Sequence, residues 1–385
     1  MPGPSWLAAL SPLAAVLLAL HLGILAMVAV STLWMRRRRR ARRPVGSLPR
    51  VSVLVPARNE EHTLPALLSS LLAQRYPDLQ IVVVDDASED GTADVLRAHA
   101  DPRLHVVSGT GPPAGWIGKP HALYQAARRA DSELYLFLDA DARLADPDAL
   151  TRLVSAFASC APHESRLASS GVALTGLPRY RDPFPAVLLT SLVPFAVLAA
   201  LPVPLVPRVR SAALSALNGQ LWLIGAEDYR RLAPHEEVAA EILEDVMIGR
   251  YLKRKGVQLW FEDLSAEVEV RMYGTLGEAW RGFRKNAFLL AGGGRWVPFL
   301  LFFAAYALVW VVAPLLSLVT FVSAWLIKAA IDRAMRLPWP VSLFGPLPLW
   351  LGAVLQLDSA RAHARGRVDW KGREVALKQG SGDAA

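Results

Sequence analysis

Two carboxylates lie two residues apart directly after an apolar run, in Leu134-Tyr-Leu-Phe-Leu-Asp-Ala-Asp141. Alternation along an extended chain places the side chains of Asp139 and Asp141 on the same side. Carboxylate oxygens so arranged bind Mg²⁺ or Mn²⁺ and leave coordination positions for phosphate. A metal held there neutralises a departing diphosphate as a Lewis acid. An Asp-x-Asp is common by chance, but its place after a buried run indicates a metal and diphosphate site.

Charged groups also follow two earlier apolar runs. The sequence Pro56-Ala-Arg-Asn-Glu-Glu61 follows the first run, and its Arg58 either holds a phosphate or makes a salt bridge at a helix start. Asp85 and Asp86 follow the second run. Adjacent carboxylates there are costly unless a cation or a hydrogen-bond donor meets them. A ribose, a base N–H or a metal satisfies this requirement, whereas capping by Ser88 or Thr92 does not explain Asp86.

A lysine and an acidic cluster complete the candidate residues. Lys119 lies in a loop that leads into a helix, which suits a phosphate contact, although a solvated loop residue is the alternative. Glu241, Glu244 and Asp245 are predicted to share one turn of a helix over 240–251. Like charges so close raise each other's pKa, so one of them can take a proton from an acceptor hydroxyl near neutral pH. The alternative is a solvated acidic helix start.

The elements that must position these residues are visible as short apolar runs. Residues 51–55, 81–84 and 134–138 are continuous runs typical of strands buried on both faces. Helical patterns separate them, at 64–72 and 121–130. This alternation predicts an α/β fold with a mostly parallel sheet and flanking helices. Ligands bind such sheets at the carboxyl ends of the strands, which is where the charged motifs lie.

The ordered motifs resemble glycosyltransferase family 2, which has the Rossmann-like GT-A fold. The matches are Val51-Ser-Val-Leu-Val-Pro-Ala-Arg-Asn-Glu-Glu61, Val84-Asp-Asp-Ala-Ser-Glu-Asp-Gly-Thr92, Leu138-Asp-Ala-Asp141 and Glu244-Asp-Val246. The resemblance implies a divalent metal, Mg or Mn, at Asp139 and Asp141, and Asp245 as the general base. It also implies a nucleotide-sugar site, formed by Pro56, Arg58, Glu60, Asp86, Lys119, Asp139 and Glu244.

A narrower resemblance is to the membrane-bound glycosyltransferases of carotenoid and hopanoid pathways. The shared features are the Gly115-Trp-Ile-Gly-Lys119 loop and Arg271-Met-Tyr273. The tail Trp370-Lys-Gly-Arg373 is also similar to the ceramide glucosyltransferases. The Gln-x-x-Arg-Trp of processive synthases is absent near 277–284, which favours single transfer. A mixed aromatic and basic stretch suits the acceptor at a lipid interface or a packed helix with a charged outer face; its residues are Trp280, Phe283, Arg284 and Lys285.

Composition sets the class of protein. Of 385 residues, 53% are hydrophobic and 20% are charged, which excludes a disordered chain. The lone Cys160 excludes an internal disulfide and a CxxC motif. Seven arginines between Arg36 and Arg43 nearly account for the net charge of +8. Because they follow a long apolar run, they indicate a membrane flank, and no nucleic-acid partner is predicted.

Long uncharged stretches predict membrane segments. Trp6–Met35 is too long for the apolar region of a signal peptide, and the positive-inside rule places the residues after it in the cytoplasm. Trp296–Ile327 and Leu337–Leu357 are predicted to form a transmembrane hairpin around a polar loop over 328–336. The proline-rich stretch Pro183–Pro207 is expected to lie in the membrane surface or to cap an acceptor groove, and a buried segment of the soluble domain is the alternative.

Together these features predict a multi-pass protein of the cell (inner) membrane with a cytoplasmic catalytic domain. The expected activity is inverting transfer of a single sugar from a nucleotide-diphosphate sugar to a lipid acceptor such as a hopanoid or carotenoid. A membrane-anchored nucleotidyltransferase and a non-catalytic nucleotide-sugar-binding scaffold are the alternatives. The expected domains are an anchor with its basic flank, a GT-A domain, a transmembrane hairpin and a basic tail, over residues 1–43, 44–290, 291–358 and 359–385.

Overall fold

The computed structural model describes residues 11–162, 164–365, 369–370 and 373–374. The chain divides into two compact units. A helical unit takes its residues from Met1–Thr32, Asp182–Ala200 and Met272–Ala385, and a sheet unit takes its residues from Leu33–Arg181 and Leu201–Arg271. The first helix, α1 (Pro12–Arg40), begins in the helical unit and ends in the sheet unit.

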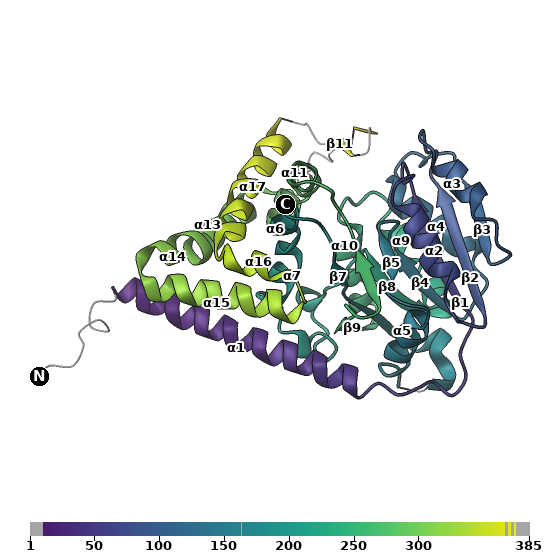
Figure 1. The fold of residues 1–385 in the computed structure, drawn as a ribbon, viewed down its shortest axis with the longest axis horizontal. Coiled ribbons are helices and arrows are strands. Elements are labelled where there is room, and N and C mark those ends of the chain that lie inside the picture. Colours follow the sequence, from purple (N-terminus) through teal and green to yellow (C-terminus); the bar gives the residue numbers. More distant parts are fainter. Residues whose placement is uncertain (1–10, 163, 366–368, 371–372, 375–385) are drawn as a thin grey trace, which may run out of the picture. The chain divides into compact units, whose positions relative to one another are not determined.

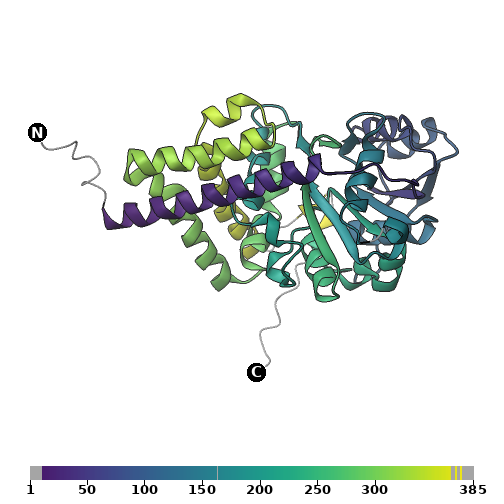
Figure 2. The same ribbon diagram turned by 90° about the horizontal axis from the view of Figure 1, so that it is seen from below.

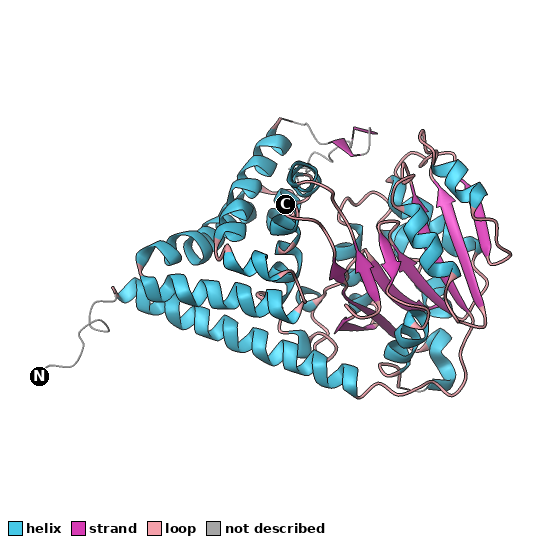
Figure 3. Cartoon of the chain, viewed as in Figure 1, coloured by secondary structure: helices cyan, strands magenta, loops and turns pink. Residues whose placement is uncertain are grey.

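The sheet unit is built on a seven-stranded sheet of order β3-β2-β1-β4-β8-β6-β9. Its strands are coloured magenta in Figure 3. The pairs of β1 with β2 and β4, of β2 with β3, and of β6 with β9 are parallel, whereas β8 is antiparallel to both β4 and β6. A smaller sheet has the order β5-β10-β7. The strands are β1 (Val51–Ala57), β2 (Leu79–Asp85), β3 (Leu104–Ser108), β4 (Leu134–Leu138), β5 (Ala142–Leu144), β6 (Val172–Leu177), β7 (Arg179–Tyr180), β8 (Leu221–Gly225), β9 (Gln258–Asp263) and β10 (Val268–Val270).

The predicted α/β fold with a mostly parallel sheet is confirmed. The three apolar runs form β1, β2 and β4, and the side chains of β4 are almost completely buried. Helix α4 packs on β1 and β2, so the chain around the central strands is strand, helix, strand as predicted. The helices of this unit are α2 (Leu64–Leu72), α3 (Thr92–Ala98), α4 (Gly118–Arg129), α5 (Ala149–Ala158), α8 (Ala226–Leu232), α9 (Pro234–Glu237) and α10 (Glu244–Arg254), with short 3₁₀ turns η1 (Glu164–Ser169), η2 (Val203–Leu205) and η3 (Ala212–Leu214).

The helical unit contains two of the apolar helices that the sequence predicts. Among the described residues, α1 and the continuous helix Trp296–Leu316 are long and apolar enough to cross a membrane. The first part of α1 lies beside α15 (Leu318–Ala334) in both Figure 1 and Figure 2. His21 of α1 hydrogen-bonds to Ser323 of α15 at 2.7 Å and to the carbonyl of Val309 at 3.0 Å. This part of α1 is therefore packed into a bundle.

The remaining elements of the helical unit are short or interrupted. They are α6 (Val187–Thr190), α7 (Leu192–Leu198), α11 (Leu276–Arg284), α12 (Ala287–Gly292), α13 (Trp296–Ala307), a π-helical turn η4 (Leu308–Val312), α14 (Ala313–Leu316), α16 (Trp339–Leu343), α17 (Leu347–Ala364) and the strands β11 (Asp369–Trp370) and β12 (Arg373–Glu374). The proline-rich stretch thus forms two short helices in its first part.

The expected hairpin differs in three places. The stretch Trp296–Ile327 is divided at Ser317, whose extended backbone separates α14 from α15. The polar loop expected over 328–336 is wrong, because α15 continues to Ala334. Lys328 and Asp332, four residues apart on one face of α15, bury their opposite charges together at 2.5 Å. The stretch Leu337–Leu357 is likewise divided between α16 and α17. The limits and topology of the membrane segments stay predictions.

Candidate active site

Lys119 lies at the centre of the acidic residues that end the central strands. It is in the first turn of α4 rather than in the loop before it, since the helix begins at Gly118. Its ammonium group lies 2.8 Å from a carboxylate oxygen of Asp139, just after β4, and 3.0 Å from Glu244 of α10. These ion pairs draw the Asp-x-Asp motif and the Glu-Asp motif into one cluster. The phosphate contact predicted for Lys119 stays a prediction.

Asp245 is held by the backbone. Its Oδ2 accepts from the N–H of Gly219 at 3.1 Å, and its Oδ1 accepts from the N–H of Val246 at 2.8 Å. A Cβ at Gly219 would lie 3.1 Å from the Cβ of Asp245 and 3.2 Å from the Lys119 ammonium. Glycine therefore allows the chain before β8 to approach both groups closely. The sequence signal was weak: a lone Gly before a strand.

The electrostatics of the cluster differ from one carboxylate to the next. Burial, and then the charge of Glu244, raise the pKa of Asp245 to about 6, although Lys119 and the two backbone N–H groups oppose the shift. Burial also raises the pKa of Asp139 against the attraction of Lys119. The pKa of Lys119 is itself raised, because its three carboxylate neighbours outweigh the cost of burial. Lys119 therefore stays charged, and Asp245 titrates just below neutral pH.

The acidic turn differs in one respect from the expectation. Helix α10 begins at Glu244, and Glu241 lies before it outside the helix. The shared turn predicted for the three acidic residues is therefore wrong, because the chain turns between Glu241 and Glu244. Glu244 and Asp245 remain paired at the first turn, where the helix dipole favours negative charge.

The register of the sheet places Asp139 and Asp141 at the strand ends. Leu138 of β4 pairs with Leu221 of β8, and the N–H of Asp139 donates to the carbonyl of Gln220 at 3.1 Å. Asp141 is reached two residues on, and its carbonyl accepts from the N–H of Arg271 at 3.1 Å. The chain turns after β4, so Asp139 and Asp141 do not continue the strand. The alternation of side chains along an extended chain, which was expected to place them on the same side, ends at Leu138.

The donor set fits a metal bound together with a substrate. Among the described residues no group of three or more His, Cys, Asp or Glu side chains could hold a metal ion alone. Mg²⁺ is usually held by one or two carboxylates with phosphate oxygens and water completing the octahedron. Asp139 and Asp141 match that requirement, and Lys119 already neutralises part of the charge on Asp139.

The ends of β1 and β2 form a second cluster around Arg58. Arg58 is buried, and it donates to the carbonyls of Asp86 and Ala87, each at 2.7 Å, and pairs with Glu89 at 3.2 Å. It therefore orders the loop after β2, which is one of the two roles left open for it. Ala87 is in the left-handed region at φ 54° and turns this loop back toward β1. Pro56 lies within β1, opposite Val84.

The two clusters approach each other along α4 and β1. Burial lowers the pKa of His121, which lies two residues after Lys119, and the negative charge of Asp86 partly opposes this shift. The negative charge of Glu60 contributes to the raised pKa of Asp139. The Glu60 carboxylate accepts a hydrogen bond from the hydroxyl of Thr63 at 2.6 Å. His121, which the sequence analysis did not select, also packs edge-on against Trp116 at 5.4 Å.

The predicted acceptor residues all lie in or just after α11 of the helical unit. Trp280 donates to Asp358 of α17 at 2.8 Å, and Arg284 lies 3.8 Å from the same carboxylate. Phe283 packs edge-on against Tyr273 at 5.5 Å, and Lys285 follows the helix. The residues are half-buried, so α11 is a packed helix with a partly open surface. Their contact with an acceptor stays a prediction.

Comparison with known proteins now identifies the sheet. Residues 52–161 match the family described as glycosyl transferase family 2, and this range includes β2, β4 and all of β1 except its first residue. These residues are therefore similar to glycosyl transferase family 2. The predicted family resemblance is thereby confirmed, and the matched region includes Arg58, Asp86, Lys119, Asp139 and Asp141.

Curated relatives match part of the chain. The chain is 37% identical over 108 residues to a 4,4'-diaponeurosporenoate glycosyltransferase of Staphylococcus haemolyticus, which is 28% of either chain. It is 35% identical over 107 residues, again 28% of either chain, to the protein of the same name in Staphylococcus aureus. The chain thus spans little more than a quarter of the length of the curated relatives it matches.

A solved structure resembles the whole fold. The mannosyltransferase PcManGT from Pyrobaculum calidifontis, in complex with GDP-Man and Mn²⁺, is similar to this chain. The match covers 90% of this chain and 99% of the PcManGT chain. The TM-score is 0.51 and the sequence identity is 22%. The likeness confirms the GT-A fold predicted from the sequence.

Proposed function

We propose that the chain is a membrane-bound inverting glycosyltransferase that moves one sugar from a nucleotide-diphosphate sugar to a lipid acceptor. The observation that carries the proposal is the cluster of Lys119, Asp139, Glu244 and Asp245. It joins the Asp-x-Asp and Glu-Asp motifs at one edge of a family 2 sheet. The name of the staphylococcal relatives supports a carotenoid-type acceptor, and the GDP-Man and Mn²⁺ bound to PcManGT support a nucleotide-sugar donor and a divalent metal.

The donor is proposed to lie along the ends of β1, β2 and β4. Arg58 holds the loop that presents Asp86 to the base or ribose. Asp139 and Asp141 would hold Mg²⁺ or Mn²⁺ together with the diphosphate, and the bound cation would neutralise the charge that develops on the leaving group. Lys119 supplies a fixed positive charge at the same place, because its ammonium group stays protonated.

Asp245 is proposed as the general base. With a pKa of about 6 it is mostly ionised at pH 7, and it is still basic enough to take a proton from a hydroxyl. The acceptor oxygen attacks the anomeric carbon of the sugar while its proton passes to Asp245. A carbon–oxygen bond forms to the acceptor as the bond to the diphosphate breaks, so the configuration inverts. The N–H groups of Gly219 and Val246 fix the orientation of this carboxylate.

The apolar helices support a membrane location. Only 22% of the apolar window of α1, and of the helix Trp296–Leu316, is buried. Large side chains such as Val297, Leu301 and Leu318 are 68%, 69% and 77% exposed. Surfaces of this kind mark sites of interaction with membranes or partners. We propose that the catalytic domain is cytoplasmic and that the acceptor reaches it from the bilayer.

The test is transfer by the purified full-length chain in detergent. UDP- and GDP-sugars are offered in turn with a membrane lipid extract and Mg²⁺ or Mn²⁺, beside Asp141→Ala and Asp245→Asn. We expect one donor to give a new glycolipid that both variants lose. Release of pyrophosphate from a nucleoside triphosphate would instead indicate a nucleotidyltransferase. Metal-dependent nucleotide binding with no turnover on any lipid fraction would favour a binding scaffold.

A further inference from the structure

The seven arginines between Arg36 and Arg43 lie in the last turns of α1, which ends at Arg40, and in the residues just after it, and they differ in exposure. Arg38, Arg39 and Arg42 have side chains 22%, 30% and 8% exposed. Arg38 and Arg39 lie one helical turn after Met35, which is 2% exposed, and Arg42 lies just beyond the helix. The other arginines of the run are classed as exposed: Arg36, Arg37, Arg40 and Arg43. Both sets belong to the sheet unit.

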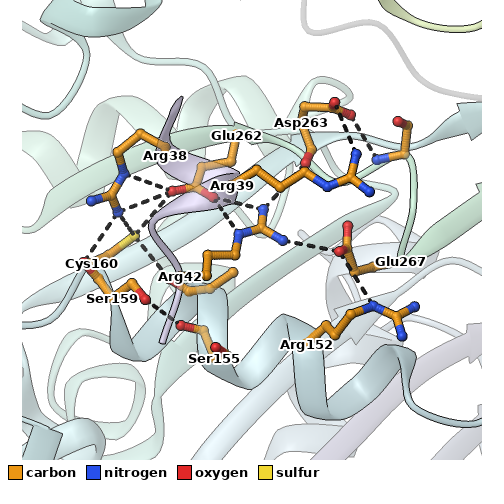
Figure 4. A network of polar contacts seen from close by, with 12 residues as sticks. Arg38, Arg39, Arg42, Arg152, Ser155, Ser159, Cys160, Glu262, Asp263 and Glu267 are labelled. Atoms are coloured by element: carbon orange, nitrogen blue, oxygen red, sulfur yellow. Dashed lines mark hydrogen bonds and ion pairs between the residues drawn. The ribbon is translucent and has the colours of Figure 1, made fainter. Parts of the chain in front are cut away.

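The inward set is paired with carboxylates at the end of β9 and just beyond it (Figure 4). Arg42 lies 2.8 Å from Glu262 and 3.0 Å from Glu267, while Arg38 lies 3.1 Å from Glu262. Arg39 lies 3.6 Å from Asp263. The side chains of Glu262 and Glu267 are 1% exposed, so their charges are buried and require these partners.

Aromatic stacking fixes the same face of the helix. Trp34 stacks on Trp260 of β9 at 6.1 Å, and the guanidinium of Arg38 lies 4.3 Å from the centre of the Trp260 ring. The inward arginines are therefore part of the packing of this unit. The membrane flank predicted for the whole run stays a prediction, and the outward members are the ones whose charges are free of this packing.

We propose that Arg36, Arg37, Arg40 and Arg43 form a docking surface for the phosphate groups of anionic phospholipids. They are exposed, carry one sign of charge, and lie directly after the uncharged stretch of α1, with Leu33 49% exposed one turn earlier. A helix that leaves the hydrocarbon region places its next turns among the headgroups. Guanidinium groups bind phosphate with two parallel hydrogen bonds, and each arginine near an anionic surface improves binding about fivefold.

The inference rests on the membrane location in the proposed function but not on the transfer reaction. It assigns the two sets of arginines opposite roles: the inward set holds the end of α1 against β9, and the outward set selects the charge of the lipid. A readout of lipid binding therefore separates its failure from that of the glycosyltransferase proposal.

The test uses the full-length chain in a neutral detergent, titrated with phosphatidylglycerol or, as the control, phosphatidylcholine. Native mass spectrometry counts the bound lipid, and thermal unfolding gives the Tm at each lipid fraction. The outward variant R36Q/R37Q/R40Q/R43Q is compared with the inward variant R38Q/R39Q/R42Q. If the inward variant does not fold, Arg39→Gln alone replaces it, because Arg39 is the most exposed member of its set.

We expect the outward variant to keep the wild-type Tm without lipid and to bind phosphatidylglycerol at least tenfold more weakly. We expect the inward variant, or Arg39→Gln, to unfold at a lower temperature without lipid and to keep its phosphatidylglycerol affinity within about twofold. Unchanged phosphatidylglycerol binding by the outward variant would overturn the proposal. So would equal binding of the two lipids by the wild type, or preferential capture of a single-stranded oligonucleotide offered as a competing polyanion.

Discussion

The replacement Asp245→Asn removes the proposed base with almost no change in volume. Asp245 accepts from two backbone N–H groups, and an asparagine oxygen keeps one of these bonds. The side chain stays in place but no longer takes a proton. General base catalysis contributes about 10²- to 10⁴-fold, so we expect kcat to fall by at least about 100-fold while donor binding persists.

The raised pKa of Asp245 gives this prediction a pH dependence. With a pKa of about 6, the wild-type kcat/KM falls about tenfold for each pH unit below 6 and is level above 7. The residual activity of Asp245→Asn lacks this fall. Glu244→Gln removes a charge that raises the pKa of Asp245, so the kcat/KM of this variant begins to fall at a lower pH than that of the wild type.

Stability follows from the same shift. A pKa raised from 3.8 to about 6 favours the protonated form in the folded state, so this contribution is present below about pH 4 and is lost as the pH passes 6. The shift corresponds to at most about 3 kcal/mol. We therefore expect the wild type to lose stability relative to Asp245→Asn between pH 4 and pH 7.

The assays are initial transfer rates and thermal unfolding over pH 4 to 9 in one detergent, for the wild type and both variants. The reasoning is refuted if Asp245→Asn keeps both its activity and an acid fall centred near pH 6, because another group is then the base. A Glu244→Gln profile that does not move would contradict the assigned cause of the shift.

Three further changes are expected to have measurable effects. Lys119→Met removes a charge that lowers the pKa of Asp245, so the loss of activity in acid should begin at higher pH. The same change should lower kcat/KM by about 100-fold or more, and transfer rates measured over pH test both effects. Gly219→Ala places a Cβ 3.1 Å from Asp245, so it should lower kcat by about tenfold or more with donor binding retained; an unchanged kcat would contradict the tight approach. Lys328→Met leaves Asp332 buried without its partner and should lower the free energy of unfolding by about 3–5 kcal/mol. The double variant Lys328→Met with Asp332→Leu should recover most of this loss.

Much of the sheet could be predicted because its strands are continuous apolar runs. Residues 134–138 form β4 with the predicted limits, and 51–55 and 81–84 form most of β1 and β2. The antiparallel pairing of β8 with β4 could not be predicted, since it depends on the tertiary path between them. Local periodicity specifies a strand but not its neighbour.

The charged stretches were harder to predict because burial depends on partners distant in sequence. The run over 328–336 looked like a polar loop, but an i, i+4 ion pair makes Lys328 and Asp332 compatible with a buried helix. The arginine run looked uniform, and its division into an inward and an outward set depends on Glu262 and Glu267, more than 200 residues away. A single sequence contains no signal for such pairings.

The site was predictable as a set of residues but not as an arrangement. Asp139, Glu244 and Lys119 were selected separately by their place after apolar runs or at helix starts, and the structure brings both carboxylates within 3.0 Å of the Lys119 ammonium. The phosphate chemistry expected of Lys119 does not reveal that it also neutralises these carboxylates. Gly219 was missed because its role is steric and depends on the neighbouring chain.

The configuration of the product tests the central claim most directly. The glycolipid formed from the accepted donor is purified, and the anomeric configuration of its sugar is determined by NMR and compared with that of the donor. The account predicts one sugar per lipid with inverted configuration, because Asp245 activates the acceptor for a single displacement. Retention of configuration, or a chain of several sugars on one lipid, would contradict it.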